Sequence, residues 1–306
     1  MTTDQKYGKL KDILLKMGDV VIAYSGGVDS TFLLKVAKDV LKDKVLGIIA
    51  TSPTYPSREY EDALKVASEI GVEIKIIKTK EMDNPKFSEN PVDRCYFCKT
   101  ELFEKIKDIA KKENFRNFVD GSNADDLGDY RPGMKALKEK HIRSPLMEAG
   151  LIKNEIRQLS KMLNLPTWDK PALACLSSRF PYGEKIDLKK LKMVDEVENF
   201  LHDAGFKNIR ARHFDKTVKI EVSSEEIDKV ICHQVGKGHR EQVMKALGIS
   251  PDKDFCTFPY LGNMGTVSLP MTAAIADERG FLSRGDRVGL LGIGSGLNCL
   301  MLALEW

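Results

Sequence analysis

Residues 25–30 read SGGVDS, a run that combines the residue types able to hold a phosphate against a protein backbone. Glycines lack the Cβ atoms that would keep a phosphate away, a following helix offers free amides, and hydroxyl groups add donors. We therefore predict that Ser25, Gly26, Gly27 and Ser30 cradle the phosphates of a nucleotide. Their order differs from the GxxxxGK[ST] and GxGxxG phosphate motifs. The alternative is an ordinary glycine turn between a strand and a helix.

A second chemical signal is the pair Cys95 and Cys98, which lies in the run DRCYFCK. At the start of a helix both thiols point to the same side, where they can bind a metal. A closed zinc site needs two further ligands, and the sequence has no second CxxC or HxxxH; a thioredoxin-like redox pair would follow a first strand. Both remain alternatives. The six cysteines do not resemble a disulfide framework in a chain of 306 residues, so metal or sulfur chemistry fits better.

Four strand-like apolar segments alternate with amphipathic helical segments and predict the elements that position these residues. We expect strands at residues 20–24, 45–51, 72–78 and 118–120, and helices near residues 31–41, 58–70 and 100–112. This alternation predicts an α/β fold with a doubly wound parallel sheet. Ligands of such sheets bind beyond the carboxyl ends of the strands, so the loops there are expected to meet in one crevice. The loop residues predicted to contact the nucleotide or Mg²⁺ are Ser52, Gly121, Asn123 and Asp125, with plain turns as the alternative.

The composition is that of an ordinary globular protein, with 42% hydrophobic and 30% charged residues. The length allows one large or two ordinary domains. A net charge of +3 and a pI near 8.4 are too mild to demand nucleic acid as a partner. Because the sequence has neither a signal-like start nor a long apolar run, we expect a cytoplasmic protein that makes no membrane contact.

Five motifs together resemble the LarE family of sulfur transferases, which belongs to the PP-loop ATP pyrophosphatases. They are SGGVDS, DRCYFCK, DGSNADDLGDYRPG at residues 120–133, SPLMEAGL at residues 144–151, and LPTWDKPALACLSSRFPYG at residues 165–183. The resemblance covers roughly residues 1–222. It implies an enzyme that uses ATP and Mg²⁺ to adenylate the carboxylates of pyridinium-3,5-biscarboxylic acid mononucleotide. Conversion to thiocarboxylates then serves the biosynthesis of the nickel-pincer cofactor.

The resemblance offers two sources for the transferred sulfur. In one branch of the family a single cysteine of the CLSSR-like segment gives up its own sulfur and becomes dehydroalanine, and Cys175 occupies that place. In the other branch three cysteines bind a four-iron four-sulfur (4Fe-4S) cluster that carries an extra sulfide. Cys95, Cys98 and Cys175 match that pattern, and three thiolates leave one iron open for a transferable sulfide. We favour the cluster on this basis.

Three residues have predicted roles close to the reacting groups. Asp29 is expected to orient Mg²⁺ or the glycine turn, although an aspartate at a helix start is also an ordinary N-terminal cap. Ser178 and Arg179 directly follow Cys175 and are predicted to position a phosphate or the reacting carboxylate, because a guanidinium offers two parallel donors to such oxygens.

Further basic residues are predicted to contact the nucleotide substrate. By the resemblance, Arg131 faces the substrate, with a surface salt bridge as the alternative. Arg210 and Arg212 alternate on a strand and therefore face one side, where they are predicted to bind the mononucleotide phosphate; a solvated strand face is the alternative. Glu221 is expected to bind a cation beside them.

After about residue 223 the sequence instead resembles the C-terminal portion of ketoacyl-ACP synthase III, a thiolase-fold condensing enzyme. The matching runs are IDKVICHQVGKGH at residues 227–239, FPYLGNMGTVSLP at residues 258–270 and SRGDRVGLLGIGSGLNCLMLALEW at residues 283–306. His233 and Asn263 would be the pair that stabilises the condensation intermediate, but the nucleophilic cysteine of that family would lie in a half that this sequence lacks. Complete condensing activity is therefore not expected.

We predict a PP-loop domain at residues 1–182, a truncated α+β substrate lobe at residues 183–224 and a partial thiolase-like segment at residues 225–306. The expected partner is a small nucleotide substrate, together with further copies of the chain if the last segment permits a homo-oligomer. Two other functions remain open. A tRNA-thiolating enzyme would need a strongly basic RNA-binding part, and a noncatalytic nucleotide-binding chimera would bind ATP without transferring sulfur.

Overall fold

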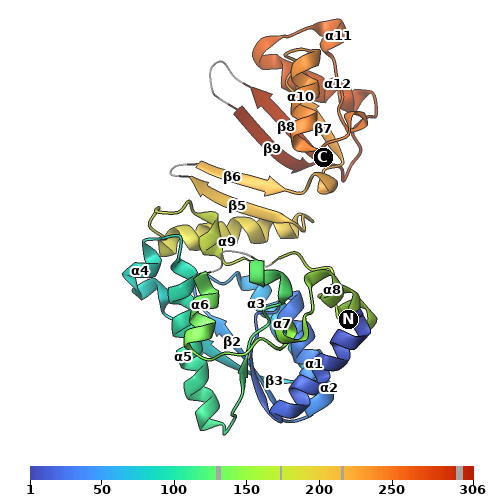
Figure 1. The fold of residues 1–306 in the computed structure, drawn as a ribbon. Coiled ribbons are helices and arrows are strands. Elements are labelled where there is room, and N and C mark those ends of the chain that lie inside the picture. The colour runs from blue at the N-terminus through green and yellow to red at the C-terminus, as the bar shows by residue number, and fades with distance from the viewer. Residues whose placement is uncertain (129–131, 173, 215–216, 294–298) are drawn as a thin grey trace. The chain divides into compact units, whose positions relative to one another are not determined.

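The computed structural model describes residues 1–128, 132–172, 174–214, 217–293 and 299–306 (Figure 1). The chain forms two compact units. The first consists of Met1–Val197 and Arg212–Val218, and the second of Glu198–Ala211 and Lys219–Trp306. Among the described residues, no helix has both the length and the apolar character needed to cross a lipid bilayer.

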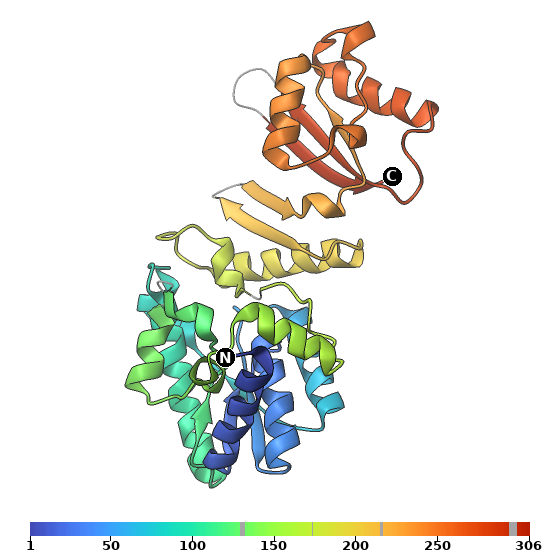
Figure 2. The ribbon, with the colours of Figure 1, turned by 45° about the vertical axis from the view of Figure 1, so that its right-hand side comes forward.

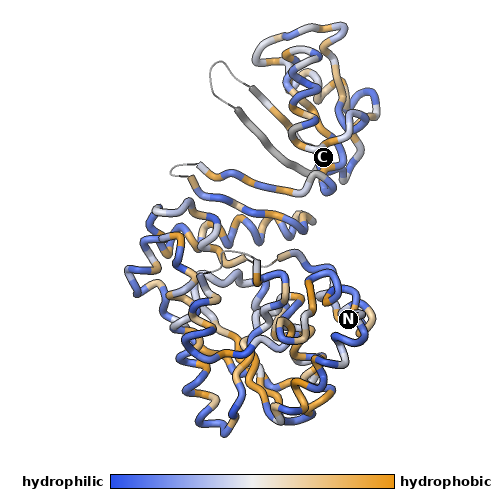
Figure 3. The backbone as a smooth tube through the Cα atoms, in the orientation of Figure 1, coloured by the Kyte–Doolittle hydropathy of each residue, from blue (hydrophilic) through white to orange (hydrophobic). Residues whose placement is uncertain are grey.

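A four-stranded parallel sheet organises the first unit. Its strands β1 (Val20–Ala23), β2 (Val45–Thr51), β3 (Glu73–Lys78) and β4 (Phe118–Val119) lie in the order β3-β2-β1-β4. The first three residues of β1 are fully buried because helices cover both faces of the sheet. Figure 3 shows hydrophobic residues gathered in the region of this sheet. This arrangement confirms the predicted doubly wound parallel sheet.

Two helical layers cover the sheet of the first unit. Helices α1, α2, α3, α7 and α8 contribute to the core on one face, and α5 and α6 contribute to the core on the other. Their bounds are α1 Thr3–Met17, α2 Val28–Leu41, α3 Ser57–Ile70, α5 Arg94–Lys112, α6 Pro132–Glu139, α7 Pro145–Ala149 and α8 Lys153–Met162, with the short α4 at Pro85–Ser88. Helix α5 begins at Arg94 rather than near residue 100, so both cysteines of the CxxC pair lie in its first two turns.

The central position of β1 determines where a ligand can bind. Strand β1 has β2 on one side and β4 on the other, so the connections that leave these two neighbours lie on opposite sides of the β1 loop. In open α/β sheets a crevice forms at such a point, outside the carboxyl ends of the strands. The glycine turn after β1 occupies this place.

The second unit contains a three-stranded sheet in the order β7-β8-β9, with β7 at Lys229–Cys232, β8 at Arg287–Ile293 and β9 at Cys299–Glu305. Figure 2 shows this sheet with the helices beside it, of which α10 (Lys237–Leu247) and α12 (Ser268–Glu278) contribute to its two cores. Strands β7 and β8 are parallel, whereas β8 and β9 are antiparallel. The remaining elements are α9 at Leu188–Asp203, the paired strands β5 (Ile209–Phe214) and β6 (Thr217–Val222), and α11 at Phe258–Leu261.

Candidate functional site

The glycine turn presents donors at the N-terminus of α2. Gly27 is the N-cap of this helix and, because it has no side chain, makes no capping hydrogen bond to the first amides. The hydroxyl oxygens of Ser25 and Ser30 lie 3.1 Å apart, and the Ser25 amide donates to Ser30 Oγ over 3.2 Å. The Tyr55 hydroxyl donates to the Ser25 carbonyl oxygen over 2.8 Å and so fixes the turn from β2's side of the sheet. Open amides and two hydroxyls at a helix start form an anion-binding arrangement.

Two glycines permit close backbone approaches around this turn. Gly26 has a left-handed φ of +67°, and a Cβ atom there would lie 2.5 Å from Ala63 Cβ on α3. A Cβ atom at Gly121, just after β4, would lie 2.9 Å from the backbone nitrogen of Ser30. The loop after β4 therefore lies directly against the first turn of α2, and the structure brings these two predicted segments together.

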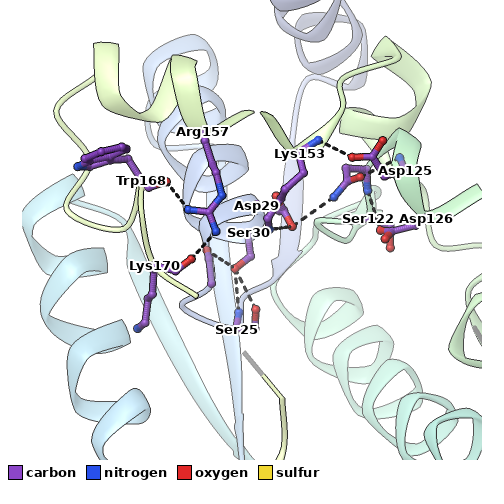
Figure 4. A network of polar contacts seen from close by, with 12 residues as sticks. Ser25, Asp29, Ser30, Ser122, Asp125, Asp126, Lys153, Arg157, Trp168 and Lys170 are labelled. Atoms are coloured by element: carbon purple, nitrogen blue, oxygen red, sulfur yellow. Dashed lines mark hydrogen bonds and ion pairs between the residues drawn. The ribbon is translucent and has the colours of Figure 1, made fainter. Parts of the chain in front are cut away.

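Asp29 in the first turn of α2 is held by a lysine that the sequence analysis did not identify. Its Oδ2 accepts hydrogen bonds from Lys153 Nζ over 2.7 Å and from Asn123 Nδ2 over 3.4 Å (Figure 4). Its buried Oδ1 has no hydrogen-bond partner within the described ranges. Burial is the main cause that raises the pKa of Asp29; the charge of Asp126 adds to it, and Lys153 opposes it.

The acidic loop after β4 is ordered by short-range hydrogen bonds. The Asp125 amide donates to Asn123 Oδ1 over 2.9 Å, and the Asn123 amide donates to Asp126 Oδ2 over 3.0 Å. Asp125 Oδ2 in turn accepts from the backbone nitrogen of Lys153 over 2.8 Å. This loop thus connects the predicted residues Asn123 and Asp125 to Asp29 through Lys153.

The donor set around Asp29 fits Mg²⁺. An unpartnered buried carboxylate oxygen next to a second acidic side chain suits a hard cation that takes one or two carboxylates and completes its shell with phosphate oxygens and water.

The three thiols of the predicted sulfur site come from two segments. Cys95 and Cys98 lie near the start of α5, and Cys175 is the N-cap of the 3₁₀ turn Leu176–Arg179. The pKa of the Cys98 thiol is raised, with desolvation as the largest cause. The charge of Glu81 and the other two thiols raise it further. Desolvation also raises the pKa of Cys95, and Cys175 contributes, while Arg94 and Lys99 oppose the shift. The three sulfurs therefore lie close enough to influence one another's protonation.

This arrangement does not support the predicted iron–sulfur cluster. Across the described ranges, no group of three or more His, Cys, Asp or Glu side chains is placed so that it would hold a metal ion. As placed, the three cysteines do not fit the cluster.

The turn that carries Cys175 is attached to the carboxyl end of β2. The Leu176 amide donates to the Thr54 carbonyl oxygen over 2.8 Å, and the Thr54 hydroxyl donates to Glu81 Oε1 over 2.8 Å. Arg179, which the sequence predicted to contact substrate, is buried and donates through Nη1 to the Ala174 carbonyl oxygen over 3.0 Å and to Ser178 Oγ over 2.9 Å. This nitrogen of Arg179 therefore supports the turn.

The other predicted residues lie in several places. The Ser52 hydroxyl is 2.8 Å from the Thr54 hydroxyl, and Arg212 Nη1 donates to the Ser178 carbonyl oxygen over 3.3 Å, so both join the Cys175 turn. Arg210 and Glu221 belong to the second unit. There, Glu221 Oε1 forms an ion pair with Lys219 Nζ over 3.4 Å. Arg131 lies outside the described residues.

Sequence reasoning missed Lys153, Thr54 and Glu81. Each of them acts through a contact with a residue that is distant in the chain, and none lies in a motif whose spacing indicates a role. Glu81 is only 2% exposed, and its Oε2 has no hydrogen-bond partner within the described residues. A carboxylate with so little access to water is a signal that only the folded structure reveals.

Two family models match separate parts of the chain. The model described as NAD synthase matches residues 9–113, and the model described as 3-oxoacyl-[acyl-carrier-protein] synthase III C terminal matches residues 218–306. Each match covers less than half of the chain.

Three known proteins are similar to parts of the sequence. An uncharacterized protein of Synechocystis is 42% identical over 245 residues, which are 80% of this chain and 91% of that protein. The pyridinium-3,5-bisthiocarboxylic acid mononucleotide synthase of Lactiplantibacillus plantarum is 33% identical over 222 residues, which are 72% of this chain and 80% of that protein. The acyl-CoA:acyl-CoA alkyltransferase of Shewanella oneidensis is 63% identical over 82 residues, which are 27% of this chain but only 24% of that protein.

Proposed function

The chain belongs to the PP-loop ATP pyrophosphatase family, in which it is related to LarE, and from this premise we propose that it is an ATP-dependent sulfur transferase. Its proposed substrate is pyridinium-3,5-biscarboxylic acid mononucleotide, whose carboxylates become thiocarboxylates. The observation that carries the proposal is the attachment of the Cys175 turn to the carboxyl end of β2 through the 2.8 Å bond from the Leu176 amide to the Thr54 carbonyl oxygen. This is the edge of the sheet that also carries the glycine turn.

The first step is adenylation at the glycine turn. The open amides at the start of α2 and the hydroxyls of Ser25 and Ser30 bind the β- and γ-phosphates of ATP. A substrate carboxylate then attacks the α-phosphorus, the bond to the bridging oxygen breaks, and pyrophosphate leaves. The donors that held the phosphates in ATP stabilise the charge on this leaving group.

Asp29 holds Mg²⁺ through its unpartnered Oδ1 in this proposal, with Asp126 as its acidic neighbour. Bound Mg²⁺ supplies charge neutralisation for the phosphate oxygens. Lys153 keeps Asp29 ionised by donating to its other oxygen.

The second step transfers sulfur from the Cys175 turn to the acyl-adenylate. The Cys175 thiolate attacks the carbonyl carbon, and AMP leaves with the electron pair of the carbon–oxygen bond, which gives a thioester on Cys175. Loss of the α-proton of Cys175 then breaks its Cβ–Sγ bond, which releases the thiocarboxylate and leaves dehydroalanine. The raised pKa values of Cys95 and Cys98 keep these thiols protonated near neutral pH, where they are poor nucleophiles. We assign sulfur delivery to Cys175 because its turn is attached to the carboxyl end of β2.

Replacing Lys153 with methionine is expected to move the acid limb of the pH profile for pyrophosphate release to higher pH. Burial already raises the pKa of Asp29, and removing the ammonium that opposes this shift raises the pKa further, so Asp29 loses its charge at a higher pH. The measurement is kcat/KM for pyrophosphate release between about pH 5 and 8. Lys35→Met is the matched control, because Lys35 pairs with Asp39 on the exposed side of α2. Identical profiles for both variants would contradict the role of Lys153.

The C-terminal segment has no separate activity in this proposal. Its similarity to the acyl-CoA:acyl-CoA alkyltransferase covers 24% of that protein, so three quarters of the relative has no counterpart here. We propose that the segment completes the folding of the second unit, and that the full chain forms a homo-oligomer that sedimentation would detect.

Turnover of the full chain with ATP, Mg²⁺ and the biscarboxylate mononucleotide tests the function. We expect pyrophosphate release that depends on the substrate, together with a thiocarboxylate product detected by mass spectrometry. Loss of sulfur from Cys175 would identify the cysteine itself as the donor. Intact cysteines with bound iron and acid-labile sulfide would instead identify a cluster. ATP binding without pyrophosphate release or thiocarboxylate would contradict the proposal and support a noncatalytic chimera.

A further inference from the structure

Asn90 adopts an uncommon backbone conformation in the segment between α4 and α5. Its φ of +56° lies in the left-handed region, where asparagine is tolerated better than most residues. The residue is fully buried, with 0% exposure. A buried polar side chain must find hydrogen-bond partners, so its contacts show what the conformation achieves.

The polar groups of Asn90 connect the segment after Cys175 to the segment before α5. Its Nδ2 donates to the Pro181 carbonyl oxygen over 2.7 Å and to the Phe180 carbonyl oxygen over 3.4 Å. Its own carbonyl oxygen accepts from the Gly183 amide over 2.9 Å. Asn90 Oδ1 accepts from Arg94 Nη1 over 2.8 Å, which fixes the orientation of the amide group.

Arg94 joins the same contact from α5. Its guanidinium carbon lies 4.7 Å from the centre of the Tyr182 ring, so the arginine binds both Asn90 and the segment that Asn90 holds. These contacts flank the thiols in the sequence, because Arg94 directly precedes Cys95 and the segment 180–183 follows Cys175.

The Cys175 turn is therefore attached at two places. Thr54 at the end of β2 holds its start through the Leu176 amide, and Asn90 holds the residues that follow it. The first attachment places the turn at the nucleotide edge of the sheet. The second places it beside the helix that carries Cys95 and Cys98.

We propose that Asn90 is a positioning residue that sets the Cys175 turn against the CxxC helix. This inference rests on the proposed function. It adds the residue that holds the Cys175 thiol near the thiols of Cys95 and Cys98. Without the Nδ2 donors the Phe180 carbonyl oxygen loses this bond, and the Pro181 carbonyl oxygen keeps only the Glu184 amide. Backbone bonds from the Gly183 amide to Asn90 and from the Ile186 amide to Ser88 remain, so the segment is held less firmly against α5 while Thr54 still holds its start. Adenylation uses the glycine turn and does not depend on this contact.

Two substitutions separate the side chain of Asn90 from its backbone conformation. Asn90→Gly keeps the left-handed backbone and removes every side-chain bond. Asn90→Asp keeps the acceptor for Arg94 and nearly the same volume, but replaces the Nδ2 donor with an oxygen that repels the two carbonyls. Asn114→Gly is the matched control, because Asn114 is exposed, follows α5 and has a similar φ of +60°.

The test measures the rate at which a short bismaleimide joins Cys175 to Cys95 or Cys98, with the linked peptides identified by mass spectrometry. Both Asn90 variants are expected to slow this reaction about tenfold, which corresponds to the loss of buried hydrogen bonds. Asn114→Gly is expected to react like the unchanged chain. Circular dichroism and thermal unfolding confirm that the variants are folded, and Asn90→Asp carries the test if Asn90→Gly does not fold.

A wild-type rate of cross-linking in folded Asn90→Asp would overturn the inference. Cross-linking needs no ATP and no turnover, so this result would leave the sulfur-transferase proposal unaffected. Conversely, absence of pyrophosphate release in the unchanged chain would contradict the proposed function without altering the comparison of cross-linking rates.

Discussion

Cys175→Ser is expected to abolish thiocarboxylate formation while substrate-dependent pyrophosphate release continues. A hydroxyl group can neither donate sulfur nor replace a thiolate as nucleophile, so the loss should reach about ten-thousandfold or the detection limit. The adenylation donors at the start of α2 are unchanged in this variant. The measurement is a single-turnover assay that follows pyrophosphate and the sulfur-containing product separately.

Cys256→Ser serves as the control for Cys175→Ser. Cys256 is also a half-buried free cysteine, but it lies in the second unit, where its thiol donates to Gln234 Oε1 over 3.3 Å. We expect this variant to transfer sulfur normally. Thiocarboxylate formation by Cys175→Ser at the rate of the control would show that the sulfur comes from elsewhere.

Gly26→Ala is expected to unfold at a lower temperature and to lose ATP binding. The left-handed backbone at φ +67° strains any residue with a Cβ atom, and that atom would overlap Ala63 Cβ at 2.5 Å. These two effects together correspond to about 2 to 5 kcal/mol of the free energy of unfolding. Because α3 or the turn must move, the amides that bind phosphate are displaced. Thermal unfolding and calorimetric titration with ATP measure the two consequences.

Gly27→Ala is the matched control for the stability part of this experiment. Gly27 has an ordinary φ of −78°, and the nearest atom to an added Cβ would be Ser25 Oγ at 3.5 Å, which is a normal contact. We expect this variant to unfold close to the temperature of the unchanged chain. Equal unfolding temperatures for both alanine variants would contradict the described approach of the turn to α3.

The sheet was predictable because its signal is local. Buried parallel strands read as continuous apolar runs, and the expected segment 45–51 coincides with β2. The glycine turn after β1 was equally visible from its spacing. The helix near residues 100–112 was predicted to start too late. Asp93, a residue type favoured at N-caps, precedes Arg94 and was a usable signal for the start of α5, although its side chain makes no capping hydrogen bond.

The candidate site was less predictable because much of it depends on tertiary contacts. The pairing of Asp29 with Lys153 joins residues from different helices, and Thr54 with Glu81 joins the ends of two neighbouring strands. Tertiary structure also explains why the contacts of Arg179 were hard to predict. Its sequence position next to Cys175 indicated a substrate contact, whereas the fold directs one of its nitrogens to the turn itself.

The hydrophobic core of the second unit has a consequence for exchanging parts between such proteins. Phe206 and Ile209, upstream of the thiolase-like similarity, pack in one cluster with Ile227 and Val230, and Glu226 accepts hydrogen bonds from the backbone of residues 207 and 208. The sequence similarity to the synthase III C terminal begins at residue 218, whereas the compact unit that contains this segment also includes residues 198–211. A shortened gene that stops at residue 224 would leave Phe206 without its covering, so a successful graft has to include residues 198–211 with the segment it transplants.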